Sequence, residues 1–192
     1  MTTLTGLPAH VLLVHAVVVL VPMSALLVLL VGVWPTARRQ WALPTAVLAV
    51  ATAVCVPLAT ESGEWLERRV ESTALLRDHT ELGDTMVPWA IGLAVVAVAL
   101  GVRELIAARA RRRAGSPAAV GDPGTTTNAS DRTTARVPGG RVLSAALAVL
   151  AAVVAVGSVI SVYRIGDSGA RAAWTDRFSE QPHPPLLPPD QP

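Results

Sequence analysis

Four long apolar stretches without a charged side chain constrain this sequence more than any other feature. They cover residues 11–33, 41–60, 85–102 and 142–162. A helix needs roughly 20 residues to cross the hydrocarbon core of a bilayer. Because no water reaches the peptide groups there, each stretch must form its hydrogen bonds within itself, which favours helix over strand. The sequence therefore predicts an all-α, integral membrane four-helix up-down bundle, surrounded by the lipid bilayer of the cell membrane.

The distribution of the arginines predicts the orientation of this multi-pass chain. All 16 basic side chains are arginine. Arg38 and Arg39 follow the first stretch, and the run Arg111–Arg113 follows the third, whereas residues 61–84 are rich in Asp and Glu. Cytoplasmic loops carry the excess of basic residues. We therefore expect both termini and the acidic loop 61–84 to be extracytoplasmic, and we interpret the arginine run as a topology anchor, with no nucleic acid as a partner.

Composition divides the chain into two helical parts and two polar segments. Residues 114–140 are rich in Gly, Ser, Thr and Pro, and the tail is rich in Pro, so we expect both segments to be disordered. The predicted organisation is 1–113 with helices one to three, 114–140 as a cytoplasmic linker, 141–178 with helix four and an outer motif, and 179–192 as the tail. The four helices are expected to form one domain. Cys55 is the only cysteine, which excludes a disulfide framework and a CxxC zinc site.

Polar residues of four helices are predicted to reach one level of the membrane. We extended each helix from its cytoplasmic arginine by roughly 20 residues, at about 1.5 Å per residue. The outer boundary then falls near His15, Glu61, Asp84 and Tyr163–Arg164. A second polar layer, one or two turns further out, contains His10, Glu64, His79 and Asp167. Such layers indicate a candidate site, although charges also gather wherever membrane helices end.

His15 is the first candidate for a functional residue, because the run 11–21 around it is otherwise apolar. An ionisable residue at such a position usually faces the bundle interior and has a partner. His15 and His79 are candidate axial ligands of haem b, with His10 as a further candidate. His15, Glu61 and Asp84 could instead hold a metal ion, or His15 could form a structural hydrogen bond with either carboxylate. His10 and His15 are separated by about 140° around an ideal helix, so a straight segment does not bring both to one ion.

Three short segments carry a resemblance to a known family. They are Gly6–His15, His79–Asp84 before the third apolar stretch, and Val162–Ala170 at the end of the fourth. Together they resemble the bacterial domain of unknown function 2231 family over most of the chain except the linker and the tail. The resemblance implies a four-helix membrane protein, and it implies electron transfer because some relatives are joined to Rieske-type ferredoxin domains. Relatives often carry an aromatic residue and Pro after the second His, and a His in the outer motif; Ala16 and Asp167 stand at these positions here.

Two classes of function are compatible with the sequence. The first is a redox module that binds haem b or a metal near the extracytoplasmic face and works with a redox protein partner. The second is a non-catalytic scaffold or accessory subunit that binds a partner through its outer loop, in which residues 61–70 could form an amphipathic surface helix, or that forms a homo-oligomer. The sequence does not decide whether the protein is an enzyme, and a non-enzymatic role is the favoured interpretation. Hydrolysis in particular is disfavoured, because Ser62 lies outside a GxSxG motif. The absence of a CxxCH motif excludes covalently attached c-type haem.

Overall fold

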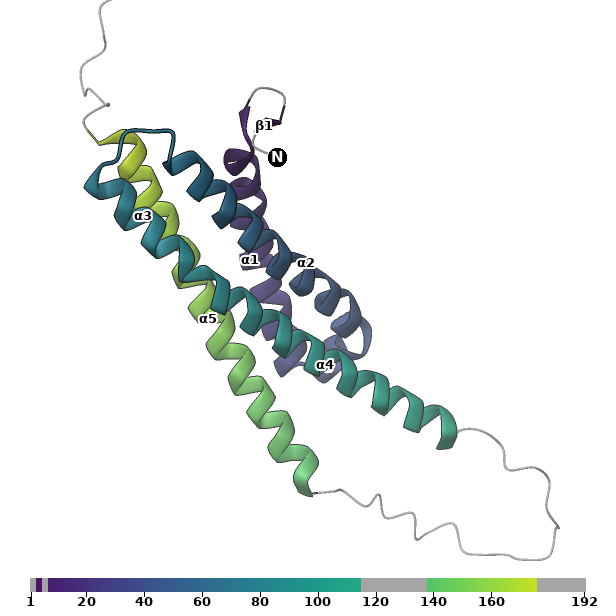
Figure 1. The fold of residues 1–192 in the computed structure, drawn as a ribbon. Helices are drawn as coiled ribbons and strands as arrows, with labels where there is room; N and C mark the ends of the chain where they lie inside the picture. Colours follow the sequence, from purple (N-terminus) through teal and green to yellow (C-terminus); the bar gives the residue numbers. More distant parts are fainter. Residues whose placement is uncertain (1–2, 5–6, 115–137, 176–192) are drawn as a thin grey trace, which may run out of the picture.

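The chain forms an all-α bundle with four spans of membrane length. The computed structural model describes residues 3–4, 7–114 and 138–175 (Figure 1). Two-residue strands, β1 (Thr3–Leu4) and β2 (Leu7–Pro8), form a minimal antiparallel pair. The helices are α1 (Ala9–Val33), α2 (Pro35–Glu67), α3 (Ala74–Asp84), α4 (Met86–Ala114) and α5 (Pro138–Trp174). Helix α3 continues almost directly into α4, and with these two taken together the described residues contain four helices long and apolar enough to cross a membrane. The predicted fold class is confirmed.

The acidic connection is largely helical, although we predicted a loop over 61–84. Helix α2 continues to Glu67, and only residues 68–73 separate it from α3. The Thr73 side chain caps α3 by accepting a hydrogen bond from the backbone N–H of Leu76 (3.2 Å). Glu, Leu, Ala and Arg dominate both segments, and all four residue types favour helices. The acidic composition correctly indicated a connection between two membrane spans, but it does not distinguish a loop from a helix.

The two segments predicted to be disordered lie mostly outside the described residues. Residues 115–137 of the predicted linker and all of the predicted tail, residues 179–192, are outside the described residues. At the linker boundaries, α4 includes Ala114 and α5 includes residues 138–140. The arginine run that we interpreted as a topology anchor forms the last turn of α4.

The helices are arranged so that each membrane-length helix contacts two neighbours. Helices α1 and α4 each pack against both α2 and α5, and α3 packs mainly against α5. The start of α1, the end of α2, α3 and the end of α5 gather at one end of the bundle, which we call the histidine end (Figure 1). The turn between α1 and α2 lies at the other end, which we call the arginine end. Helices α4 and α5 diverge toward the arginine end (Figure 1).

The interior of the bundle is built from small and medium-sized side chains, and its outside is apolar. Val21, Ala49 and Ala97 are buried between the helices. Other apolar side chains point outward, and Val47 and Val149 are 72% and 64% exposed. Small residues allow membrane helices to approach closely, and lipid tails accept an apolar exterior at no cost. Both features suit a lipid bilayer environment.

Hydroxyl groups inside the bundle form hydrogen bonds that join α1 to α2. Ser24 Oγ lies 2.8 Å from Thr52 Oγ1, and Thr52 Oγ1 donates to the carbonyl of Leu48 (2.9 Å). Because the Thr52 proton is used for Leu48, the Ser24 hydroxyl is the donor to Thr52. The pair is buried, and without the Ser24 hydroxyl the Thr52 oxygen would keep only its bond to Leu48.

We expect Ser24→Ala to lower the free energy of unfolding by about 0.6 kcal/mol, the average for hydrogen bonds between membrane helices. Unfolding in mixed micelles, followed by circular dichroism, measures this change. Ser161→Ala is the matched control, because no partner of the Ser161 hydroxyl occurs within the described part of the chain. An equal loss in both variants would mean that the Ser24 hydrogen bond contributes nothing specific.

Candidate functional site

His10 lies in the first turn of α1 and packs against the end of α2. Its Nδ1 is 3.0 Å from the carbonyl oxygen of Ala59. The Ser62 hydroxyl donates to the same carbonyl (2.8 Å) and lies 3.5 Å from Nδ1. A carbonyl oxygen only accepts, so Nδ1 must carry the proton. In the neutral His10 ring, Nε2 is therefore the nitrogen with a lone pair.

His79 occupies an equivalent position between α3 and the end of α5. Its Nδ1 is 3.0 Å from Ser168 Oγ, and the Ser168 hydroxyl donates to the Ile165 carbonyl (2.9 Å). The Ile165 carbonyl also bonds to the His79 ring. Because the Ser168 proton is used for Ile165, Nδ1 of His79 must donate to Ser168. The neutral ring again leaves its lone pair on Nε2.

A glycine beneath each imidazole allows the ring to rest directly on a helix backbone. A Cβ atom at Gly63 would lie 2.9 Å from Cε1 of His10, and a Cβ atom at Gly169 would lie 2.9 Å from Cε1 of His79. Real Cβ contacts are not that short. Any larger residue at either position would therefore push the imidazole away from its carbonyl and serine partners.

The two imidazoles are close enough to influence each other. Both are partly buried, and His10 acts electrostatically on His79. Two protonated rings in this arrangement would repel each other. The hydrogen bonds for which the ring nitrogen is identified all involve Nδ1, in both histidines. Metal-binding histidines commonly show this pattern, in which one ring nitrogen donates to a fixed oxygen and the other is free to bind the metal.

The two histidines belong to an internal repeat that relates α1 to α3 and α4. His79 follows His10 by the same number of residues by which Gly101 follows Gly32. Both glycines are buried at helix crossings: a Cβ atom at Gly32 would meet α5, and one at Gly101 would meet α2. The crossing of α1 with α5 therefore corresponds to the crossing of α4 with α2.

The same repeat relates α2 to α5. Residues 45–63, TAVLAVATAVCVPLATESG, align without a gap with residues 151–169, AAVVAVGSVISVYRIGDSG. Thr52 donates to the carbonyl four residues before it, and so does Ser158 at the equivalent position. Alanine and valine are common in membrane helices, so identical apolar residues at equivalent positions are weak support for the repeat. The equivalent hydrogen bonds of Thr52 and Ser158 are stronger support. The bundle consists of two similar helical hairpins, and each hairpin contributes one histidine.

His15, which we predicted as the centre of the site, lies elsewhere. It is exposed, and its Nδ1 is 2.6 Å from the carbonyl oxygen of Val11 in the preceding turn. Glu61 and Asp84 are also exposed. The described part of the chain contains no group of three or more His, Cys, Asp or Glu side chains that could hold a metal ion. The structure therefore places His10 against the end of α2 and His79 against the end of α5. Among the described residues it does not bring His15, Glu61 and Asp84 together.

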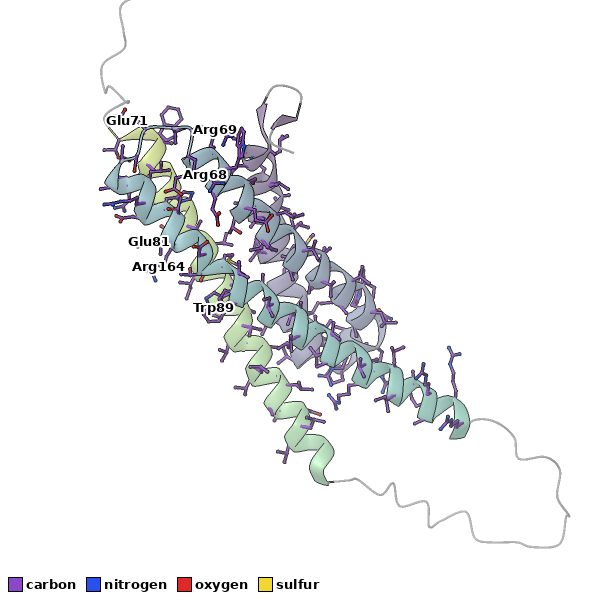
Figure 2. All side chains as sticks on the ribbon, viewed as in Figure 1. Arg68, Arg69, Glu71, Glu81, Trp89 and Arg164 are labelled. Carbon is purple, nitrogen blue, oxygen red and sulfur yellow. The ribbon has the colours of Figure 1, made fainter. Side chains whose placement is uncertain are left out.

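The predicted outer polar layer lies at the histidine end, mainly on the surface. Glu64 and Asp167 each form an exposed ion pair with the arginine four residues later, at 3.8 Å and 3.0 Å. Such pairs contribute little to stability. Tyr163, Arg164 and Asp167 are exposed and, with Ser168, line a cavity of about 290 Å³ between α3 and α5. The labelled charged side chains at this end in Figure 2 are Arg68, Arg69, Glu71, Glu81 and Arg164.

Ser62, Ser168 and the glycines after them are functional candidates that sequence reasoning missed. The sequence does contain a signal for them. The two aligned segments, 45–63 and 151–169, both end in an acidic residue followed by Ser-Gly, which begins at Glu61 in the first and at Asp167 in the second. Comparison of the chain with family models, curated proteins and solved structures gave no match. The geometry of the two histidines is therefore the basis for interpreting the site.

Proposed function

We propose that this protein is a membrane redox module that binds haem b through His10 and His79. The observation that carries the proposal is that both imidazoles use the same ring nitrogen, Nδ1, for their hydrogen bonds to the protein. In both rings Nδ1 donates to a fixed oxygen, so both neutral rings present Nε2 as the ligand atom. Each ring comes from a different helical hairpin, so each hairpin would contribute one of the two residues that hold the haem.

The number of available ligands favours haem over a bare metal ion. Haem supplies four nitrogens to its iron and needs only axial ligands from the protein, which two histidines provide. A structural zinc site usually takes four protein ligands, and the described residues contain no group of three potential ligands. The iron of a bound haem would accept and donate one electron. His10 and His79 would hold the haem and fix the orientation of both axial rings.

The surroundings of the site support a role in electron transfer at the outer face of the cell membrane. The positive-inside rule places the arginine end in the cytoplasm, so the histidine end and both termini would be extracytoplasmic. The resemblance to the domain of unknown function 2231 family adds support, since some relatives are joined to Rieske-type ferredoxin domains. A redox protein partner would then approach the histidine end.

A scaffold function is the second candidate, and the same hydrogen bonds support it. His10 joins α1 to α2, and His79 joins α3 to α5. These contacts would stabilise a cofactor-free bundle whose outer surface binds a partner or a second copy of the chain. The Arg69 guanidinium stacks 3.7 Å from the centre of the Trp65 ring, at the end of α2. This contact would belong to the outer surface that binds the partner.

Alanine substitution of the two glycines distinguishes these functions. We expect Gly63→Ala and Gly169→Ala each to weaken haem binding by about tenfold or more, as loss of an outer-shell partner does at metal sites. The haem-to-protein ratio during titration of the full-length protein with haemin measures this effect.

Gly83→Ala and Gly166→Ala are matched controls, because a Cβ atom at either position would meet nothing within 4 Å. Both control variants should bind haem like the wild type. Equal binding by all four variants, or no binding by the wild type, would contradict the haem proposal and favour the scaffold.

A further inference from the structure

The repeat is broken at the arginine end, where the two hairpins differ. In the first hairpin only Trp34 separates α1 from α2, and Arg38 donates to the carbonyls of Val31 and Gly32 at the end of α1. In the second hairpin α4 and α5 diverge (Figure 1). The divergence leaves a groove of about 780 Å³ between them. In the first hairpin, Arg38 of α2 therefore bonds to the carbonyls at the end of α1. In the second hairpin, the described parts of α4 and α5 leave a groove between them.

The walls of this groove are apolar except at one point. Val95, Val98, Val102 and Ile106 contribute from α4, and Leu143 and Leu147 contribute from α5. Arg103 is the charged residue in the lining. The volume lies within the roughly 300–1,000 Å³ typical of small-molecule sites. The groove thus offers a long apolar surface beside a cation, at the level where the apolar part of α4 ends.

Arg103 has hydrogen-bonding capacity that its neighbours leave unused. Its Nη2 donates to Ser144 Oγ. Its Nη1 is buried, and no acceptor for it is present among the residues that the structure describes. A buried donor without an acceptor costs free energy, more so when it is charged. An acceptor supplied from outside the chain would remove that cost.

The charge around Arg103 is positive. The Arg38 guanidinium is close enough to interact with Arg103, and Glu104 is the carboxylate near them. Glu104 already forms an ion pair with Arg111. One carboxylate therefore lies among three arginines, which leaves an excess of positive charge at this point.

We propose that the groove between α4 and α5 binds an anionic glycerophospholipid, with one acyl chain along the apolar walls and the phosphate at Arg103. A phospholipid is the occupant that combines an apolar chain with an anionic acceptor, and the surrounding bilayer supplies it. Basic pockets between membrane helices bind anionic headgroups in this way. The proposal does not depend on the nature of the histidine site.

Native mass spectrometry of the full-length protein, titrated with phosphatidylglycerol or phosphatidylcholine, tests the proposal. We expect tighter binding of phosphatidylglycerol, and Arg103→Gln should weaken it about fivefold, the effect of one arginine at a membrane surface. Arg112→Gln is the control, because Arg112 is exposed on the same helix and does not line the groove. Ala99→Phe should fill the groove and reduce binding without changing the charge.

Three results would overturn the lipid site. The first is equal binding of both lipids by the wild type. The second is an equal loss in Arg103→Gln and Arg112→Gln, which would indicate general attraction to a basic surface. The third is a dimer that Ala99→Phe dissociates, which would assign the groove to a second copy of the chain.

Discussion

Replacement of either His10 or His79 by alanine is expected to abolish haem binding, with at least a tenfold fall in the haem-to-protein ratio. Each replacement would leave only one of the two imidazoles to hold the haem. The two rings have the same hydrogen-bond pattern in the two hairpins, so the two losses should be of similar size. Haem content of full-length protein purified in detergent measures the effect, and circular dichroism confirms that the variants remain helical.

His15→Ala is the control for both substitutions. His15 bonds to the Val11 carbonyl of its own helix, so its removal should leave haem content unchanged. His79→Met adds a further test, because methionine can replace histidine as an axial ligand and raises the reduction potential. Loss of haem in His15→Ala with retention in His10→Ala would contradict the assignment of the ligands.

Gly157→Ala is expected to lower the stability of the bundle. A Cβ atom at Gly157 would overlap the ring of Trp89, which packs across from α4. Overpacking of this kind typically costs 1–3 kcal/mol, and the gain in helix propensity of about 1 kcal/mol offsets only part of it. Thermal unfolding in detergent, followed by circular dichroism, should show a lower midpoint.

Gly166→Ala on the same helix is the matched control for Gly157→Ala. A Cβ atom there would meet nothing within 4 Å, so the substitution should leave stability unchanged or raise it by up to about 1 kcal/mol. Equal midpoints for the two variants would mean that Trp89 reorients freely and that the close contact does not hold α4 against α5.

The spans were predictable from sequence because length and the absence of charge decide what can cross a bilayer. The 18-residue stretch 85–102 and its neighbours all became helices. The ends of the helices were not predictable in the same way. Arginine and glutamate residues beyond the apolar stretches are also good helix formers, so α4 continues to Ala114 and α2 to Glu67.

The level of the site was predictable, but the direction of its side chains was not. Counting residues from the cytoplasmic arginines placed His10 and His79 in one polar layer, and in the structure each ring lies against a neighbouring helix. The same count placed His15 at the membrane boundary and gave no information on which face of α1 it occupies. Rotation around a helix depends on packing against neighbours, here on the contact of Gly63 with His10. Comparison of the two acidic-Ser-Gly segments would have pointed to the histidines that pack against Gly63 and Gly169.

A reduced-minus-oxidised absorption spectrum of the wild-type protein, purified from cells supplied with haem, tests the haem site most directly when metal analysis is done on the same sample. We expect the sharp α-band of a low-spin b-type haem and one iron per chain. A colourless protein without bound metal, obtained under the same conditions, would contradict the haem site and leave His10 and His79 as structural links within the two hairpins.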